Sequence, residues 1–173
     1  MLVYHQQTAE MIAQRIAAGK SSVCRMDLVM RRPYSPQLCD DWESVHGVPL
    51  PESVREWYTQ PNALELLYHG FHRNHDPLYP DQFQLEHGVG PDGSGRVALT
   101  VIEEEIGCCV WGAALDGSAD PPGVTRWNVD ETDPAPERRW WVCAPTFSNL
   151  LATLIDGSRS LYPNCYENQI YMV

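Results

Sequence analysis

Histidines stand at every third position of the segment HGFHRNH, as His69, His72 and His75, and Asp76 follows them. Imidazole nitrogens and carboxylate oxygens are common metal ligands. On a helix, however, His75 would be rotated by roughly 240° from His69. The segment also contains a glycine and ends before Pro77, and both residues disfavour a regular helix. We therefore interpret it as a polar loop and expect no bound metal.

Three consecutive glutamates, Glu103, Glu104 and Glu105, offer carboxylates of the kind that hydrolyse glycosides. Three like charges in a row repel one another and favour solvent, so they cannot all face a core. Because any acidic strand end would look the same, we interpret them as a rim open to water or to a partner.

Motifs for nucleophilic catalysis and for phosphate binding are missing from the sequence. No GxSxG is found, and no serine or cysteine lies in a recognisable elbow or beside a partner histidine. The glycine-rich GVGPDGSG at 88–95 lacks the Lys-Ser/Thr ending of a P-loop. We therefore expect no catalysis, no cofactor and no small-molecule ligand.

Acidic residues dominate the charge of this chain, whose formal net charge is −11. Residues 100–137 contain nine acids and one base, which gives −8, whereas residues 1–35 contain two acids and five bases, which gives +3. Phosphate binding needs clustered lysine and arginine, so nucleic acid and anionic membranes are excluded as partners. A basic protein surface fits better, although acidity could also serve solubility alone. The candidate partner-binding residues are Glu103, Glu104, Glu105, Asp116, Asp120, Asp130, Glu131 and Asp133.

The six cysteines form no CxxC pair, and Cys108 and Cys109 are adjacent, so on a strand they would face opposite sides. Buried free thiols in a reducing compartment account for them. The first twenty residues lack a signal peptide, and about 18 consecutive apolar residues occur nowhere. We expect a cytoplasmic protein.

Helical spacing recurs in four segments. Residues 4–18 place Met11, Ile12 and Ile16 close to one stripe with Thr8. The pair Ser35-Pro36 starts a second helix, which Gly47 ends. The predicted buried residues of the last three helices are Leu38, Trp42 and Val45, then Leu50, Val54 and Trp57 or Tyr58, and finally Phe147, Leu150, Leu151, Leu154 and Ile155. Residues 23–30 fit a strand or a helix.

Strands are predicted at 97–103, 108–115, about 123–129 and 140–143, after a turn at 91–95. The adjacent Trp140 and Trp141 should face opposite sides of the sheet, which would leave one partly exposed. Residues 63–91 look like a loop with one helical turn near 80–83.

At 173 residues the chain suits one domain. We expect a single α+β domain with a twisted, largely antiparallel sheet flanked by helices. It would consist of an N-terminal helical extension at 1–35, a core domain at 36–156, and a tail at 157–173 that could add a strand.

The order of these pieces resembles the SUKH superfamily, which includes the Smi/Knr-type cell-wall regulator domain and many bacterial immunity proteins. The resemblance rests on HGVPLPESVREWY, HDPL, IEEEIGCCVWGAAL, DPPGV and APTFSNLLATLI, and covers about residues 36–156. Leu50-Pro51 matches the start of a family helix. Glu104, Gly107 and Trp111 match an acidic strand end and the strand that follows it.

The resemblance implies a non-catalytic protein that binds and neutralises a cognate toxin in the cytoplasm, often a nuclease. Together with the charge pattern, it predicts an immunity protein whose acidic surface binds a basic toxin. The alternative is an intracellular scaffold or regulatory protein-binding module.

Overall fold

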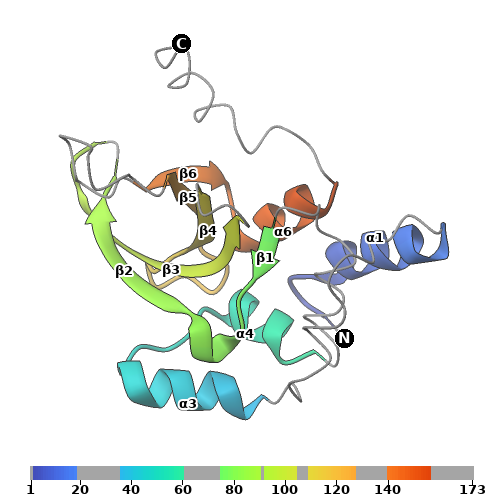
Figure 1. Ribbon diagram of the computed structural model, residues 1–173, viewed down its shortest axis with the longest axis horizontal. Helices are drawn as coiled ribbons and strands as arrows, with labels where there is room; N and C mark the ends of the chain where they lie inside the picture. The colour runs from blue at the N-terminus through green and yellow to red at the C-terminus, as the bar shows by residue number, and fades with distance from the viewer. Residues whose placement is uncertain are drawn as a thin grey trace.

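The computed structural model describes residues 2–18, 36–60, 75–90, 92–104, 109–127 and 140–156. Within these ranges, helices flank one six-stranded antiparallel sheet (Figure 1), which confirms the predicted α+β class. The helices are α1 (Gln6–Ala17), α3 (Gln37–His46), α4 (Glu52–Tyr58), the 3-10 helix η1 (Pro80–Gln82) and α6 (Phe147–Asp156). The strands are β1 (His75–Pro77), β2 (Gln84–Val89), β3 (Gly95–Glu104), β4 (Cys109–Ala114), β5 (Gly123–Trp127) and β6 (Trp141–Ala144).

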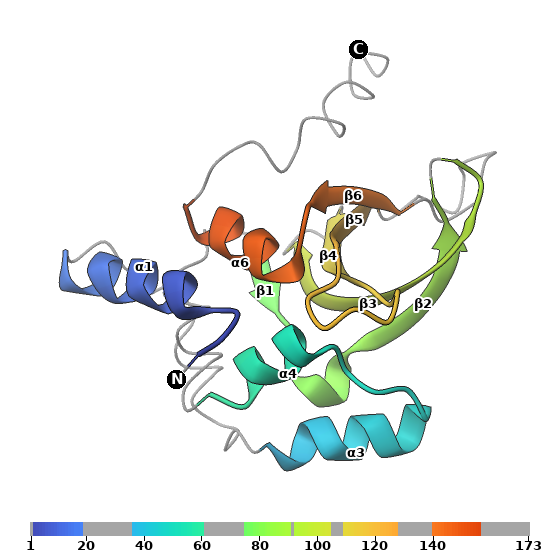
Figure 2. The ribbon, with the colours of Figure 1, turned by 180° about the vertical axis from the view of Figure 1, so that it is seen from behind.

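The sheet has the order β1-β3-β4-β5-β6, and β2 also pairs with β3. It curls strongly, so that β6 returns toward the end of β2 (Figures 1 and 2). There the backbone N–H of Trp140 donates to the Val89 carbonyl oxygen at 2.9 Å. The curl gives the sheet a helix-covered face and an inner face.

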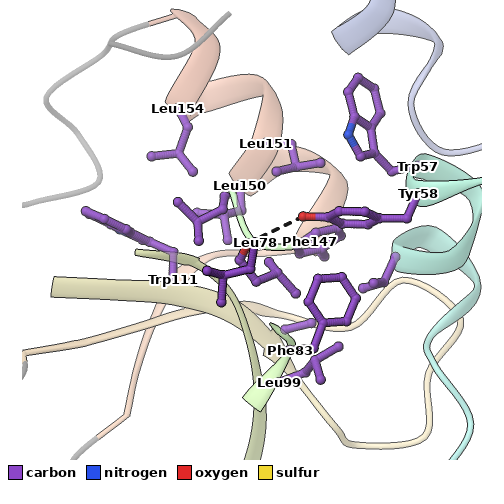
Figure 3. Packing of buried hydrophobic residues seen from close by; sticks show 14 of the residues in the cluster. Trp57, Tyr58, Leu78, Phe83, Leu99, Trp111, Phe147, Leu150, Leu151 and Leu154 are labelled. Carbon is purple, nitrogen blue, oxygen red and sulfur yellow. Dashed lines mark hydrogen bonds between the residues drawn. The ribbon is translucent and has the colours of Figure 1, made fainter. Parts of the chain in front are cut away.

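The helix-covered face holds the main core, which lies between the sheet and helices α4 and α6 (Figure 3). Phe147 and both of the alternatives predicted for the preceding helix, Trp57 and Tyr58, are fully buried, as is Trp111. The five apolar positions predicted for α6 are buried as well. Helix α6 packs closely on β5, because a Cβ added at Gly123 would lie 2.7 Å from the Leu150 Cβ.

The β3–β4 pairing shifts register between Thr100 and Ile102. The extra residue lets both Val101 and Ile102 join the main core. Opposite the shift, a Cβ added at Gly112 would lie 1.8 Å from the Leu99 carbonyl oxygen. Only glycine permits β3 and β4 to approach this closely.

Two helix stripes differ from the prediction. Val45 is 79% exposed, because α3 buries Cys39 and Trp42, and Val45 is rotated by about 120° from Cys39. Ile16 is 41% exposed, whereas Thr8 and Ile12 of the same helix are buried. The buried contacts of α1 thus come from its first two turns.

Residues 75–90 are less irregular than predicted. The helical turn at η1 is confirmed, but β1 and β2 lie on either side of it, where the sequence indicated a loop. Both strands pair with β3, β2 as a hairpin across the predicted turn and β1 through a contact more distant in sequence. Trp140 is fully buried and Trp141 is half-buried, as predicted.

Residues 23–30, for which two structures were considered, and the tail at 157–173 lie outside the described residues. The described part of the 1–35 extension packs on the rest of the chain, because α1 contacts α6 and Ile12 belongs to the main core.

Candidate functional site

Two of the predicted partner-binding residues, Glu103 and Glu104, lie together at the end of β3. Both are half-buried. Glu103 pairs in register with Asp76 of β1, and its carboxylate accepts a hydrogen bond from the Gln84 Nε2 at 3.1 Å. This acidic strand end is therefore attached to the neighbouring strands.

Two further candidates, Asp116 and Asp120, lie in the connection between β4 and β5. The Asp116 carboxylate accepts hydrogen bonds from the hydroxyl and the backbone N–H of Ser118, which lower the pKa of Asp116. Asp120 accepts hydrogen bonds from the Ser148 N–H (3.1 Å) and hydroxyl (2.6 Å) in the first turn of α6. Both carboxylates thus stabilise local structure, and the lowered pKa of Asp116 favours its charged form.

The two acidic pairs lie at opposite ends of the sheet. Leu115 donates its N–H to the Val97 carbonyl oxygen, which places the Asp116 end beside the start of β3. From Val97 to Glu103 the strand extends roughly 20 Å. The other four candidates, Glu105, Asp130, Glu131 and Asp133, lie outside the described residues. The described candidates therefore form two separate groups.

Asp120 belongs to a larger acidic group, which we call the acidic corner and define as Tyr4, Glu52, Glu56 and Asp120. The N-terminal segment, helix α4 and the β4–β5 connection meet there. The Ser53 N–H at the start of α4 donates to the Ala119 carbonyl oxygen of the β4–β5 connection at 2.9 Å. The Tyr4 hydroxyl donates to the Glu52 carboxylate at 2.8 Å.

The carboxylates of the acidic corner raise the pKa of Tyr4. The hydrogen bond to Glu52 is the main reason why the pKa of Tyr4 is raised, and the charges of Glu52, Asp120 and Glu56 raise it further. The phenol therefore stays protonated and remains a donor at neutral pH. Three carboxylates within electrostatic reach of one tyrosine make this corner strongly negative.

Two described arginines, Arg55 and Arg126, pair with carboxylates outside the acidic corner. Arg55 binds Glu43 at 2.9 Å and also binds Asp40, both on α3. Arg126 is buried and binds Glu86. In the described part of the chain, no ion pair neutralises the acidic corner. Its chemistry suits the binding of lysine and arginine side chains.

The histidine next to the acidic corner, His5, is fully buried. Among the residues that the structure describes, no group of three His, Cys, Asp or Glu side chains could hold a metal ion. His69 and His72 of the predicted polar loop lie outside those residues, and His75 is described only as part of β1.

None of the cysteines that the structure describes forms a disulfide; Cys39 and Cys109 are buried and Cys143 is half-buried. Burial raises the pKa of Cys39 to about 11, so this thiol stays protonated at neutral pH. The prediction of buried thiols outside disulfides is confirmed for Cys39 and Cys109.

The sequence interpretation missed Tyr4, Glu52 and Glu56. A signal was present, since Glu52 and Glu56 are four residues apart on the predicted helix after Leu50-Pro51 and must share a face. No local pattern brings Tyr4 or Asp120 to that face. Their approach depends on how the N-terminal segment and the β4–β5 connection pack.

Comparisons of the chain with protein-family models, with curated proteins and with solved structures found no match. None of the helices in the described ranges has the length and apolar character needed to cross a membrane.

Proposed function

We propose that this protein is a non-catalytic immunity protein, which binds and neutralises a basic toxin in the cytoplasm. The observation that supports binding of a basic partner is the acidic corner, where Glu52, Glu56 and Asp120 surround Tyr4 with no described cation paired to them. The immunity role rests on the SUKH-like order of sequence motifs between residues 36 and 156.

Electrostatics gives the corner its role in recognition. A negative surface accelerates encounter with a positive partner, and the effect weakens as salt screens the charges. Because the Tyr4 hydroxyl donates its one hydrogen to Glu52, its oxygen and the carboxylates of the corner offer acceptors for hydrogen-bond donors of the partner.

The test is binding to the purified product of the adjacent gene, followed by an assay of that product's toxic activity. We expect a stable complex, loss of toxic activity on mixing, and association that slows as salt rises. A complex that leaves the activity intact would favour the scaffold or regulatory alternative. The absence of a complex would contradict the immunity role.

Matched charge reversals locate the interface. Glu52→Lys at the corner and Asp41→Lys on the exposed surface of α3 change the net charge equally. We expect Glu52→Lys to weaken the complex about tenfold or more and Asp41→Lys about twofold or less. Equal effects would show that total charge, and not the corner, controls binding.

A further inference from the structure

His5, which stands just before α1, is fully buried against the body of the protein. Its ring lies edge-on to Trp57 of α4, with ring centroids 5.1 Å apart, and edge-on to Phe147 of α6 at 6.0 Å. In a histidine without solvent contact, each ring nitrogen either finds a hydrogen-bond partner inside the protein or has none.

The backbone around His5 is held by one carboxylate. Glu56 accepts hydrogen bonds from the N–H groups of Val3 (2.7 Å), Tyr4 (2.8 Å) and His5 (3.1 Å). Together with the bond from the Tyr4 hydroxyl to Glu52, these contacts attach the entry to α1 to helix α4.

The hydrogen bonds of the ring fix its protonation state. The His5 Nε2 lies 2.7 Å from the Ser53 carbonyl oxygen, and a carbonyl only accepts, so Nε2 carries the hydrogen. The Nδ1 is buried and has no hydrogen-bond partner among the described residues. A second proton would have to enter at Nδ1, where it would create a buried charge and a donor without an acceptor.

From this geometry we propose that residues 2–17 form a pH-sensitive latch, which stays docked while His5 is neutral and is released when its Nδ1 is protonated. Release would uncover the surfaces of Trp57 and Phe147 that His5 now covers. It would also break the bonds that Tyr4 makes to Glu52 and Glu56. The latch does not depend on the identity of any partner.

The carboxylates that face His5 favour its protonated form and so oppose release, but burial has the larger effect on its pKa. Burial lowers the pKa of His5, whereas its bond to Ser53 and the charges of Glu56 and Asp120 act in the opposite direction. Glu52 lies in the same corner, one turn before Glu56 on α4, and α6 contributes only the apolar Phe147 to the ring contacts.

The direction in which pH changes the docking follows from the lowered pKa of His5. Above the ordinary value of 6.5, His5 is neutral whether docked or released, so the docked state keeps its full stability. As the pH falls below 6.5, the released segment takes up a proton more readily than the docked one. Acidification therefore shifts the equilibrium toward release.

Hydrogen exchange measured by mass spectrometry on the full chain tests the latch. After correction for intrinsic exchange rates, we expect the protection of α1 amides to fall at least about threefold between pH 7.5 and 5.5, with β3 and β4 unchanged. An NMR titration of the His5 imidazole should give a midpoint below 6.5, and the loss of protection should lie between pH 6.5 and this midpoint.

Two glutamine variants complete the test. His5→Gln keeps a donor for the Ser53 carbonyl but does not titrate, so α1 protection should no longer change with pH. His87→Gln, at an exposed position of β2, should retain the wild-type response. The latch is excluded if wild-type α1 protection does not change with pH, or if His5→Gln loses protection on acidification as the wild type does. If His5→Gln releases α1 at every pH, the wild type decides, because a loss of protection outside the range between pH 6.5 and the His5 midpoint excludes the latch.

Discussion

The inner face of the curled sheet holds a buried ion pair between Glu86 of β2 and Arg126 of β5. The Arg126 Nε and Nη2 donate to the Glu86 carboxylate at 2.9 Å, and the Thr100 hydroxyl donates to it at 2.8 Å. The Arg126 guanidinium also lies 5.4 Å from the ring centroid of Trp140. The curl of the sheet brings these residues within reach across the two strands that separate β2 from β5.

Replacing one partner of this pair should lower the free energy of unfolding far more than replacing both. Arg126→Met leaves the Glu86 charge buried, so we expect a loss of about 3–5 kcal/mol in the free energy of unfolding, measured with urea. The double variant with Glu86→Leu should recover most of that loss, because no charge remains buried. Additive losses in the double variant would contradict this account.

Thiol reactivity gives a second prediction for single residues. Because burial raises the pKa of Cys39 to about 11, very little thiolate exists at pH 8. We expect Cys39 to resist iodoacetamide in the native protein and to react after denaturation, as read by peptide mass spectrometry. Rapid native labelling of Cys39 would show that α3 opens readily.

At the scale of elements, Asp120 joins the β4–β5 connection to the first turn of α6. We expect Asp120→Ala to cost about 1–2 kcal/mol in the free energy of unfolding, as for the loss of a helix cap. Asp116→Ala, in the same connection but exposed and bonded only to Ser118 in the contacts described above, should cost less. Equal losses would mean that Asp120 acts only within its own loop.

Most helices and the four later strands could be predicted because each has a local signal. Phe147 to Ile155 repeat at helical spacing, and Trp111 lies in a continuous apolar run. The strands β1 and β2 carry a weaker signal, since Pro77 ends the three-residue β1 and polar residues interrupt β2. The turn predicted at 91–95 joins β2 to β3 as a hairpin, whereas the pairing of β1 with β3 is a long-range contact that one sequence does not reveal.

The candidate site was less predictable than the fold. The sequence indicated the acidity of residues 100–137, yet the structure places Asp116 and Asp120 at the end of the sheet opposite Glu103 and Glu104. Sequence proximity hides this separation, although the strand predicted at 108–115 lies between the two groups and separates them by its length. The single base of that stretch, Arg126, proved to be buried, so it does not offset the surface charge.

At the scale of the whole molecule, the net charge of −11 should act on a basic partner at long range, whereas the interface acts only at contact. Because the two acidic groups lie at opposite ends of the sheet, variants at each end can separate these effects. Screening extends over about 30 Å at 0.01 M salt and about 8 Å at 0.15 M. Charges remote from the interface should therefore affect association at low salt only.

Reversing Glu103, Glu104 and Glu105 to Lys should slow association with the basic partner about two- to tenfold at low salt, with little effect at 0.3 M salt. Dissociation should not change if the acidic corner is the interface, because Glu103 and Glu104 lie at the other end of the sheet. Glu52→Lys should instead accelerate dissociation at both salt concentrations. Stopped-flow and surface plasmon resonance measure the two rates, and thermal unfolding checks that the variants remain folded. Faster dissociation of the triple variant would place the interface at the end of β3, and unchanged association at low salt would exclude steering by this group.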